Sequence, residues 1–469
     1  MDTKKLRQKI LDLAIHGKLV PQDPNDEPAS VLLERIKAEK ERLIKEGKIK
    51  RSKKSAKTSD TPHYGNVPFE VPDNWVWTIV GEVGEVITGS TPSKDIAEYY
   101  GGDIPFYKPT DLDLGINTNS ASDTLTIEGY NLSRKLPVGS ILVTCIGATI
   151  GKTGLISTEG ACNQQINAII PSSLITSTFL YYSCISEYFQ KEIRNHASAT
   201  TLPILNKNNF TKLLIPLPPL SEQQRIVKEI ERWFALIGQI EQDKVDLQTI
   251  IKQTKSKILD LAIHGKLVPQ DPNDEPAIEL LKRINPNFTP CDNGHYPIGW
   301  IKTILGELFS HNTGKALNSS NKEGIFKDYL TTSNVYWNKF DFTVIKQMPF
   351  KESELDKCTV TKGDLLVCEG GDIGRSAIWN FDYDICIQNH IHRLRPKIDL
   401  CVPFYYYTFV YLKENNLIGG KGIGLLGLSS NALHKIELPL PPLAEQQRIV
   451  QKIEALFSVL DNIQNALEV

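Results

Sequence analysis

A glycine-rich run, Gly147-Ala-Thr-Ile-Gly151-Lys152-Thr153, is the segment that first suggests chemistry. Phosphate-binding P-loops have this composition, because their backbone N–H groups and lysine surround the phosphates of a nucleotide. Here three residues separate the glycines instead of four, and apolar, strand-like sequence follows where a P-loop needs a helix. The counterpart in the second half, Gly370-Gly-Asp-Ile-Gly374-Arg375-Ser376, keeps a basic residue but not Gly-Lys-Thr. These differences argue against nucleotide binding and favour a β-turn that could present Lys152 or Arg375 to a phosphate.

Motifs for catalysis are missing from the sequence. The only Pro-Pro pairs lie in two Leu-Pro-Pro-Leu segments, and the Asn/Asp-Pro-Pro-aromatic tetrapeptide needed for methyl transfer to adenine is absent. Glu46-Gly47-Lys48 has the Glu-x-Lys form of nucleases, but it lies in a lysine-rich run without a paired aspartate on a strand. The eight cysteines form no Cys-x-x-Cys pair and no zinc spacing with histidine. We therefore expect a chain that is not an enzyme, with no metal or cofactor of its own and with most cysteines reduced and buried.

Side chains suited to the edges of nucleic-acid bases are plentiful in loops that differ between the two halves of the chain. Asn and Gln can pair bidentately with adenine, and Arg or Lys with guanine. Alternate side chains of a strand point inward, so about half of the candidates are expected to be satisfied structural groups. The candidate DNA contacts are Ser93, Lys94, Lys108, Lys152, Asn163, Gln164, Gln165, Asn206, Lys207, Asn208, Lys315, Asn334, Arg375, Gln388, Asn389, His390, Lys421 and Ser429.

Composition sets the broad class. The 469 residues are enough for two or three domains, and 41% apolar and 23% charged residues are ordinary for a globular protein. No apolar run reaches the length of a bilayer span and the start of the chain lacks a signal sequence, so we expect a cytoplasmic location. Since the net charge is −2, a polyanion would have to meet local basic patches. Residues 37–60, with ten Lys/Arg against four Asp/Glu, are either such a patch or a solvated linker.

A long helix is predicted for residues 222–262, where apolar side chains alternate at spacings of four and three. This period of 3.5 residues is typical of a coiled-coil seam, and at about 1.5 Å per residue the helix is roughly 60 Å long. Lys244 and Thr254 are the two polar interruptions. The predicted seam consists of Ile226, Ile230, Trp233, Ile237, Ile240, Leu247, Ile251, Ile258 and Leu261.

The partner of this helix is predicted to come from both ends of the chain. Residues 445–469 repeat the first part of the helix at an offset of 223, and residues 9–29 are identical to residues 257–277 at an offset of 248. The seam transfers in register to Leu6, Ile10, Leu13, Ile449, Ile453, Leu456, Leu460, Ile463 and Leu467. The chain is therefore a cyclic tandem repeat, cut in the middle of one of two antiparallel helices.

Each repeat also contains a β-rich unit with turns and a few helices. Both helix fragments end at His-Gly, at residues 16–17 and 264–265, where glycine is the expected stop and histidine a capping or packing group. We expect an α+β fold, with two mixed α/β, β-rich domains joined by two long antiparallel coiled-coil helices in a pseudo-twofold cyclic tandem repeat. The predicted segments are helix fragment 1–20, linker 21–73, domain 74–216, helix 217–268, linker 269–298, domain 299–439 and helix 440–469.

Taken together, these features resemble the specificity (S) subunits of type I restriction–modification systems, the HsdS family. The resemblance rests on two PLPPLxEQQRIV segments that open long helices, two KILDLAIHGKLVPQ segments that close them, and domains that begin NWVWTIVGEV and GWIKTILGEL. It implies that each β-rich unit is a target recognition domain reading half of a bipartite DNA sequence. It also implies two modification (M) subunits that carry AdoMet for adenine methylation, and restriction (R) subunits that use ATP and Mg for cleavage.

The helices would then set the separation of the two half-sites. One turn of duplex is about 34–36 Å, so a helix of roughly 60 Å would hold the reading domains one to two turns apart. Two other classes of function compete with this interpretation. A coiled-coil scaffold with two binding domains is compatible with the charge, whereas a stand-alone DNA methyltransferase or nuclease is disfavoured because its motifs are absent.

Overall fold

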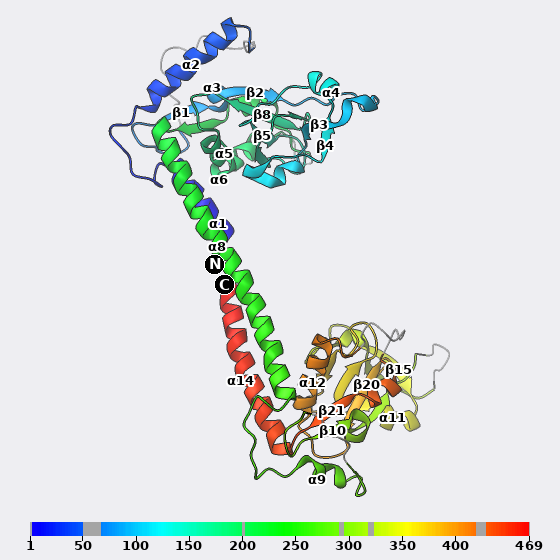
Figure 1. The fold of residues 1–469 in the computed structure, drawn as a ribbon. Coiled ribbons are helices and arrows are strands. Elements are labelled where there is room, and N and C mark those ends of the chain that lie inside the picture. The colour runs from blue at the N-terminus through cyan, green and yellow to red at the C-terminus, as the bar shows by residue number, and fades with distance from the viewer. Residues whose placement is uncertain are drawn as a thin grey trace. The chain divides into compact units, whose positions relative to one another are not determined.

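The computed structural model describes residues 2–49, 67–198, 202–289, 295–317, 323–418 and 428–468. The chain forms two compact units, Met1–Asp243 and Lys244–Val469, and the long helix α8 (Leu220–Ile263) begins in the first and ends in the second (Figure 1). Each unit combines a β-rich domain of mixed helices and sheets with the helical segments that pack on it. The expected fold class is confirmed.

The described residues of the first unit form three sheets. Their strand orders are β1-β9, β2-β8-β5-β6 and β4-β3-β7. The strands are β1 (Val76–Ile79), β2 (Gly84–Thr88), β3 (Tyr100–Tyr107), β4 (Asp123–Leu125), β5 (Ile141–Thr144), β6 (Thr153–Leu155), β7 (Ala161–Cys162), β8 (Ile166–Pro171) and β9 (Leu214–Leu217). The helices before α8 are α1 (Thr3–Ile15), α2 (Ala29–Lys45), α3 (Val80–Val83), η1 (Ala97–Tyr99), η2 (Asp111–Asn117), α4 (Ile127–Asn131), α5 (Ser177–Ile185), α6 (Glu187–Asn195) and α7 (Lys207–Thr211).

The second unit repeats the central sheet as β11-β20-β17-β18, beside sheets β10-β21, β15-β12-β19-β16 and β13-β14. Its strands are β10 (Ile301–Ile304), β11 (Phe309–Thr313), β12 (Ile325–Leu330), β13 (Val335–Tyr336), β14 (Lys339–Phe340), β15 (Lys346–Phe350), β16 (Thr359–Val360), β17 (Leu365–Cys368), β18 (Ser376–Ile378), β19 (Ile385–Ile387), β20 (Ile391–Pro396) and β21 (Glu437–Leu440). Its helices are α9 (Ala277–Lys282), α10 (Leu305–Leu308), η3 (Thr332–Asn334), α11 (Glu352–Cys358), α12 (Val402–Glu414), α13 (Ser430–His434) and α14 (Leu443–Glu468).

The central strands β5 and β17 are buried along their whole length, which explains why their sequences, ILVT and LLVC, are apolar except for Thr144. In the first unit the aromatic helix α5 lies in the same hydrophobic core as β5, and in the second α12 joins the core that contains β17. The two units therefore build the same central sheet from sequences that agree mainly at buried positions.

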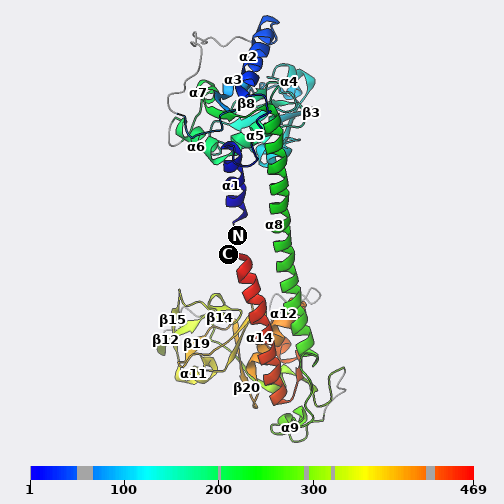
Figure 2. The same ribbon diagram turned by 90° about the vertical axis from the view of Figure 1, so that its left-hand side faces the viewer.

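Each unit also pairs α8 with a second helix that runs in the opposite direction. In the first unit α1 lies beside the early part of α8, where Arg7 Nη2 donates to Glu241 Oε2 over 2.9 Å. In the second unit α14 lies beside the late part of α8, where Lys255 pairs with Asp461 (Figure 2). In both pairs the helices are antiparallel, since α1 and α14 each run against the direction of α8 (Figure 2).

The predicted seam is correct in part. Ile10, Ile226, Ile230, Ile237, Ile251, Ile258, Ile449 and Ile453 are buried, and Leu6, Leu13, Leu247, Leu261, Leu456, Leu460 and Leu467 are partly buried. Trp233, Ile240 and Ile463 are 37%, 41% and 40% exposed, so their assignment to a buried seam was wrong. Phe234 is more covered than Trp233, although only partly buried, because Arg7 of α1 lies 5.0 Å from its ring and Tyr182 of α5 lies 5.7 Å from it. The β-rich domain, and not only a second helix, therefore decides which face of α8 is covered.

The described cysteines are free, and all except the half-buried Cys401 are buried. Among the described helices, none combines the length and the apolar character that crossing a membrane requires.

The two His-Gly stops are built alike. His16 Nδ1 lies 2.7 Å from the carbonyl oxygen of Asp12, and His264 Nδ1 lies 2.7 Å from that of Asp260, so both histidines cap their helices as expected. The glycine that follows has φ +66° in each copy, and a Cβ on Gly17 would overlap the ring of Pro72. Glycine is therefore required twice, for its backbone angle and for its lack of a side chain.

We predict that Gly17→Ala destabilises the first unit more than the matched change Gly47→Ala. Both glycines have nearly equal positive φ, +66° and +70°, but a Cβ at Gly47 meets nothing within 4 Å. The left-handed angle should cost each variant about 1–2 kcal/mol, and the overlap with Pro72 should cost Gly17→Ala about 1–3 kcal/mol more. Urea unfolding followed by circular dichroism measures the difference. Equal losses would show that the Gly17–Pro72 approach has no energetic weight.

Candidate nucleic-acid interface

One end of the central sheet in the first domain collects most of its candidate contacts. The last complete row across the four strands is Thr88–Asn167–Val143–Thr153. Beyond this row lie the loop after β2, the β5–β6 turn and the segment before β8. We call this set of loops the loop end of the domain. It carries Ser93, Lys94, Lys152 and residues 163–165.

Backbone hydrogen bonds tie the chain before α7 to the same loop end. Leu205 N–H donates to Cys145 O over 2.8 Å, and Cys145 N–H donates to Gln165 O over 2.8 Å. Gly147 N–H also donates to Pro203 O over 3.0 Å. The candidates Asn206, Lys207 and Asn208 are therefore held beside those of the sheet loops, although about forty residues separate them in the sequence.

The second domain has an equivalent loop end. Its last row is Thr313–His392–Val367–Ser376. The loops beyond it carry Lys315, Arg375 and residues 388–390. Leu428 N–H donates to Glu369 O over 3.2 Å, which brings Ser429 to this end as well. Two domains with different loop sequences thus gather polar residues at the same structural position.

Several candidates present exposed side chains at the loop ends. In the first domain these are Ser93, Lys94, Gln164, Lys207 and Asn208, and in the second His390 is exposed while Gln388 and Asn389 are partly buried. Exposed amides and amines in this setting can reach base edges or phosphates.

Other basic candidates are engaged by carboxylates within their own domain. Lys108 pairs with Asp123, and Lys152 Nζ lies 2.7 Å from Asp113 Oδ1. Lys315, with a side chain only 10% exposed, has its Nζ 2.6 Å from Glu354 Oε2. These ammonium groups are already partly neutralised, so a phosphate would have to displace or share their partners.

Two candidates of the second domain are used for its internal structure. Asn334 is buried, and its side chain accepts from Thr331 N–H and donates to the carbonyl oxygens of Asp341 and Val344. This placement removes Asn334 from the candidate interface. Arg375 donates to Thr332 O and lies 4.9 Å from the Tyr336 ring.

The remaining candidates shape the loops. Asn206 and Ser429 are the N-caps of α7 and α13, and their side chains accept from Asn209 N–H and Ala432 N–H. Asn163 Nδ2 donates to Gln165 Oε1 over 2.9 Å, which ties two candidates to each other. Lys421 lies outside the described residues.

The glycine-rich run at residues 147–153 is a turn between two strands. Strand β6 begins at Thr153, where a P-loop would begin a helix. The geometry therefore supports the interpretation of this run as a turn and not as a nucleotide site.

Sequence reasoning missed Arg134, which reaches the first loop end from the segment after α4. Its guanidinium donates to Thr88 O, and its backbone N–H donates to Ser90 Oγ over 3.3 Å. Desolvation, and after it the positive charge of Arg134, lowers the pKa of Lys207. Two cations close enough to disturb each other favour an anionic contact at this place. The sequence held no signal for the pair, because 73 positions separate its members and no repeat copy exists.

Sequence reasoning also missed the role of the Glu-Gln-Gln-Arg segment, which fixes each long helix to its domain. The buried Glu222 carboxylate accepts from Trp75 Nε1 over 2.9 Å and also from Gln22 Nε2. Glu445 does the same in the second unit, accepting from Trp300 Nε1 over 2.9 Å and from Gln270 Nε2 over 2.7 Å. We call each set a helix junction. The signal that could have indicated this role is the identical Glu-Gln-Gln-Arg sequence at residues 222–225 and 445–448.

The following residues extend the junction. Gln223 Oε1 accepts from Thr176 N–H at the start of α5 over 3.1 Å, and its amide donates to Pro218 O over 3.0 Å. Arg225 forms a bidentate pair with Asp26, with Nη2 2.6 Å from Oδ2. In the second unit Gln446 binds Cys401 N–H and Pro441 O, and Arg448 pairs with Asp274. One turn of helix therefore holds both the domain and the preceding linker.

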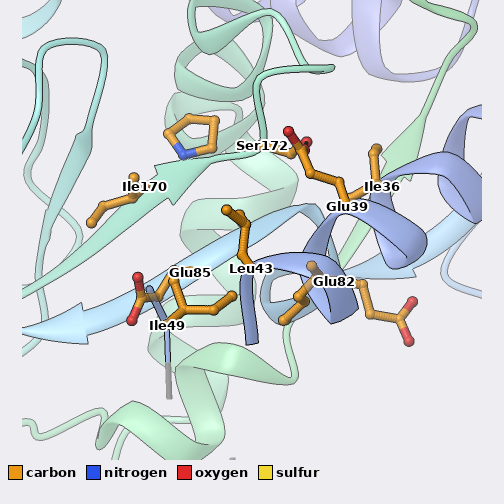
Figure 3. Close-up of a pocket in the computed structure, with 11 residues that line it drawn as sticks. Ile36, Glu39, Leu43, Ile49, Glu82, Glu85, Ile170 and Ser172 are labelled. Carbon is orange, nitrogen blue, oxygen red and sulfur yellow. Dashed lines mark hydrogen bonds between the residues drawn. The ribbon is translucent and has the colours of Figure 1, made fainter. Parts of the chain in front are cut away.

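Helix α2 adds a contact to the first unit that the short α9 does not provide in the second. Glu39 accepts from Ser172 (Figure 3) and from Ser173, and Lys40 donates to Gly81 O. Between α2 and the β2–β8 edge lies a cavity of about 100 Å³ with an apolar lining that includes Leu43 and Ile170. Up to Ile49 the lysine-rich segment is thus mainly docked helix, while residues 50–60 lie outside the described part.

Two carboxyl groups at the junction of the first unit have pKa values that are shifted in opposite directions. Burial raises the pKa of the Glu222 carboxyl, although the hydrogen bonds from Trp75 and Gln22 act in the other direction. The hydrogen bond from Arg225 lowers the pKa of Asp26. A raised carboxyl pKa means that the folded unit binds the proton more tightly than the unfolded chain. The charge on Glu222 is therefore unfavourable for stability at neutral pH and is relieved as the pH falls through its raised pKa.

Comparison with known proteins bears on both domains. A family model described as "Type I restriction modification DNA specificity domain" matches residues 72–247 and 297–469, more than half of the chain. The specificity subunit of the type I restriction enzyme EcoAI from Escherichia coli is 26% identical, in an alignment that covers 98% of this chain and 90% of that relative.

Solved structures share the fold. The HsdS subunit from Thermoanaerobacter tengcongensis aligns with a TM-score of 0.56 at 19% identity, over 85% of this chain and 93% of that one. A chain from a structural study of complex assembly and conformational transition of the type I R-M system aligns with a TM-score of 0.54 at 20% identity, over 86% of this chain and 96% of that one.

We predict that Glu222→Ala lowers the free energy of unfolding of the first unit by about 1–3 kcal/mol, because it leaves the buried Trp75 N–H without an acceptor. Glu222→Gln keeps an acceptor for Trp75 without the buried charge, so it should be slightly more stable than the wild type at pH 7.5. Its advantage over wild type should shrink as the pH falls through the raised pKa of Glu222.

Urea unfolding at pH 7.5 and pH 5 measures both effects, with the exposed Glu231→Ala on the same helix as the matched control. Equal stability of the Glu222→Ala and Glu231→Ala variants would show that the junction carboxylate does not hold the unit together.

Proposed function

The chain belongs to the family of type I restriction–modification DNA specificity proteins, and from this membership we propose that each of its β-rich domains reads one half of a bipartite DNA target. It is the specificity subunit of such a system, as its relatives are named. In this assignment the chain supplies recognition, and the reactions take place on partner subunits.

The observation that carries the proposal is the pair of equivalent loop ends. The rows Thr88–Asn167–Val143–Thr153 and Thr313–His392–Val367–Ser376 have the same sheet position, whereas the loops beyond them share few residues. A constant sheet with variable polar loops is what two readers of different sequences require, because phosphate contacts position and base contacts specify.

The partners and cofactors follow from the same assignment. Two modification subunits would hold AdoMet and methylate adenine N6, and restriction subunits would bring ATP and Mg for cleavage. The whole assembly would act on double-stranded DNA in the cytoplasm. Among the described residues, no group of three or more His, Cys, Asp or Glu is arranged to hold a metal.

Helix α8 supplies the spacing between the half-sites. Its 44 residues extend over about 66 Å at about 1.5 Å per residue. Its first turn carries Glu222, which binds Trp75 in the first unit. Its last turn is capped by His264 in the second unit. We therefore propose that helix length controls the number of base pairs between the half-sites, whereas loop residues control the half-sites themselves.

We predict that inserting one heptad into α8 after Asp243 lengthens the tolerated spacer by about three base pairs and leaves both half-sites unchanged. Seven residues add about 10 Å and rotate the helix by only about 20° relative to a strict heptad repeat. Replacing residues 74–215 with the same segment of another family member should change one half-site only.

Genome-wide adenine methylation in cells with and without each variant measures the spacer and the half-sites. Altered half-sites after the heptad insertion would refute the spacing role. Absence of any methylation dependent on the chain, together with DNA binding that does not weaken with salt, would favour a coiled-coil scaffold without a DNA partner.

A repeated apolar surface fits the modification subunits. Trp233, Leu236 and Ile240 lie at spacings of three and four on α8, and their counterparts on α14 are Leu456, Val459 and Ile463. Except for the partly buried Leu456, all are 37–56% exposed. Because the same surface occurs once in each unit, we propose that it binds one modification subunit in each.

We predict that Leu236→Asp with Ile240→Asp abolishes binding of one modification subunit, and that Val459→Asp with Ile463→Asp abolishes binding of the other. Burial of each aliphatic side chain contributes about 1.5–3 kcal/mol, so affinity should fall by more than a hundredfold for each pair. Native mass spectrometry of the assembled methyltransferase counts the bound subunits. Val245→Asp is the matched control, since Val245 is 54% exposed on the same helix and its repeat position is Glu468.

A further inference from the structure

The centre of the last row in each central sheet is a buried polar residue, Asn167 in the first domain and His392 in the second. Asn167 is 2% exposed and His392 is fully buried. Their neighbours in the row include a threonine in each case, Thr88 and Thr313, but the central residues differ in kind. Buried polar groups need hydrogen-bond partners, so the partners indicate what these residues do.

Both residues hold the chain that enters the last short helix of the domain. Asn167 Nδ2 donates to Leu205 O over 3.3 Å, and His392 Nε2 lies 2.8 Å from Leu428 O. The next residue is the N-cap, Asn206 or Ser429. An amide and an imidazole thus bind the same carbonyl position in the two repeats. We call this contact the latch of each domain.

The latch in the second domain includes further histidines. Because a carbonyl oxygen can only accept, Nε2 of His392 carries the proton and Nδ1 is the acceptor for His311 Nε2, 2.7 Å away. His434 of α13 lies against the His311 ring, with centroids 4.8 Å apart. In the first domain Val86 occupies the place of His311, and Thr88 Oγ1 donates to Asn167 Oδ1 over 2.7 Å.

We propose that Asn167 and His392 are positioning residues for DNA reading, which place the segments carrying Lys207, Asn208 and Ser429 at the loop end of each domain. This inference rests on the proposed function and deepens it. The residues lie under the reading loops and do not touch DNA themselves. Loss of either latch would free one reading segment while the sheet beneath it stays folded, so one half-site would be affected and the other would not.

The two latches differ in their response to acid. Burial first, and then the charges of His392 and His434, lowers the pKa of His311 to about 4. Burial also lowers the pKa of His392, whereas the Leu428 carbonyl and the Glu369 carboxylate act in the opposite direction. A lowered histidine pKa means that stability is fully present above about 6.5 and is lost as the pH falls towards 4. The Asn167 latch has no group that titrates in this range.

The test uses hydrogen exchange of the full chain, followed by mass spectrometry for residues 205–211 and 428–434. His392→Leu should reduce protection of residues 428–434 by about tenfold or more at pH 7.5. The reason is that the carbonyl oxygen of Leu428 loses its hydrogen-bond donor. The double variant His311→Val with His392→Asn copies the first domain and should retain protection within about threefold. Asn167→Leu should have the corresponding effect on residues 205–211 alone.

Hydrogen exchange of the wild-type chain at different pH values is an independent test, once the exchange rates are corrected for the intrinsic effect of pH. Between pH 7.5 and 4.5 protection should fall for residues 428–434 but not for residues 205–211, and the double variant should remove this difference. The latch is refuted if His392→Leu leaves protection unchanged while β17 remains protected. Equal acid sensitivity of both segments also refutes it, and this outcome can be read even if His392→Leu does not fold.

The DNA arm measures binding to duplexes that carry the bipartite target mapped by methylation, with either half-site scrambled. His392→Leu should remove discrimination at the second domain's half-site by tenfold or more and leave the other unchanged. Intact discrimination together with lost protection would show that the latch does not position a reading segment. If no mapped target exists, the proposed function fails, but the exchange data still decide whether the latch holds the loop.

Discussion

The buried carboxylate at the first turn of each long helix is the interaction on which the rest of the structure depends. Glu222 and Glu445 lie in the first turns of their helices, and each accepts hydrogen bonds from a tryptophan of the domain and a glutamine of the linker. Three separate parts of the chain therefore meet at one side chain. The direction of the helix relative to its own domain is fixed by geometry and not by a flexible connection.

The cyclic repeat keeps both junctions intact. Gln22 and Gln270, which bind the junction carboxylates, also donate to the carbonyl oxygens of Gly17 and Gly265, so each junction connects the Glu-Gln-Gln-Arg start of one helix with the His-Gly stop of another. The first unit takes the start from α8 and the end from α1, whereas the second takes the start from α14 and the end from α8. Helix α8 is thus shared by both junctions. The partner of α8 is divided into two helices, α1 and α14, and this division breaks neither junction because no junction residue lies at the point of division.

The sequence predicted what repetition encodes. The helices, their antiparallel pairing with segments from both chain ends, the domain class and the His-Gly stops follow from two offsets and a 3.5-residue period. The seam error at Trp233 has a physical origin, since periodicity cannot distinguish two adjacent aromatic residues when a neighbouring domain covers one of them. Phe234 is partly buried because Tyr182 of α5 and Arg7 of α1 contact it.

Candidate DNA contacts were harder to predict, because whether a side chain is free to bind DNA depends on partners within the protein that are distant in sequence. Lys315 was a reasonable candidate until Glu354 was found beside it, 39 positions away. The same holds for Lys152 and Asp113. Arg134 shows the reverse case, in which a residue in an unremarkable segment reaches the loop end through Thr88 and Ser90. A single sequence contains no local signal for such pairings.

The latches show how one sheet can support two different readers. The backbone hydrogen bonds that bring Leu205 and Leu428 to the loop end are equivalent, and so are the N-caps that follow. The buried side chains beneath them differ, with an amide in one domain and an imidazole in a cluster of three histidines in the other. Because both can donate to the same carbonyl, the backbone of the reading segment is preserved while its surroundings change. Loop sequences can therefore diverge above a fixed set of attachment points, which is the physical condition for changing a DNA half-site without rebuilding the domain that reads it.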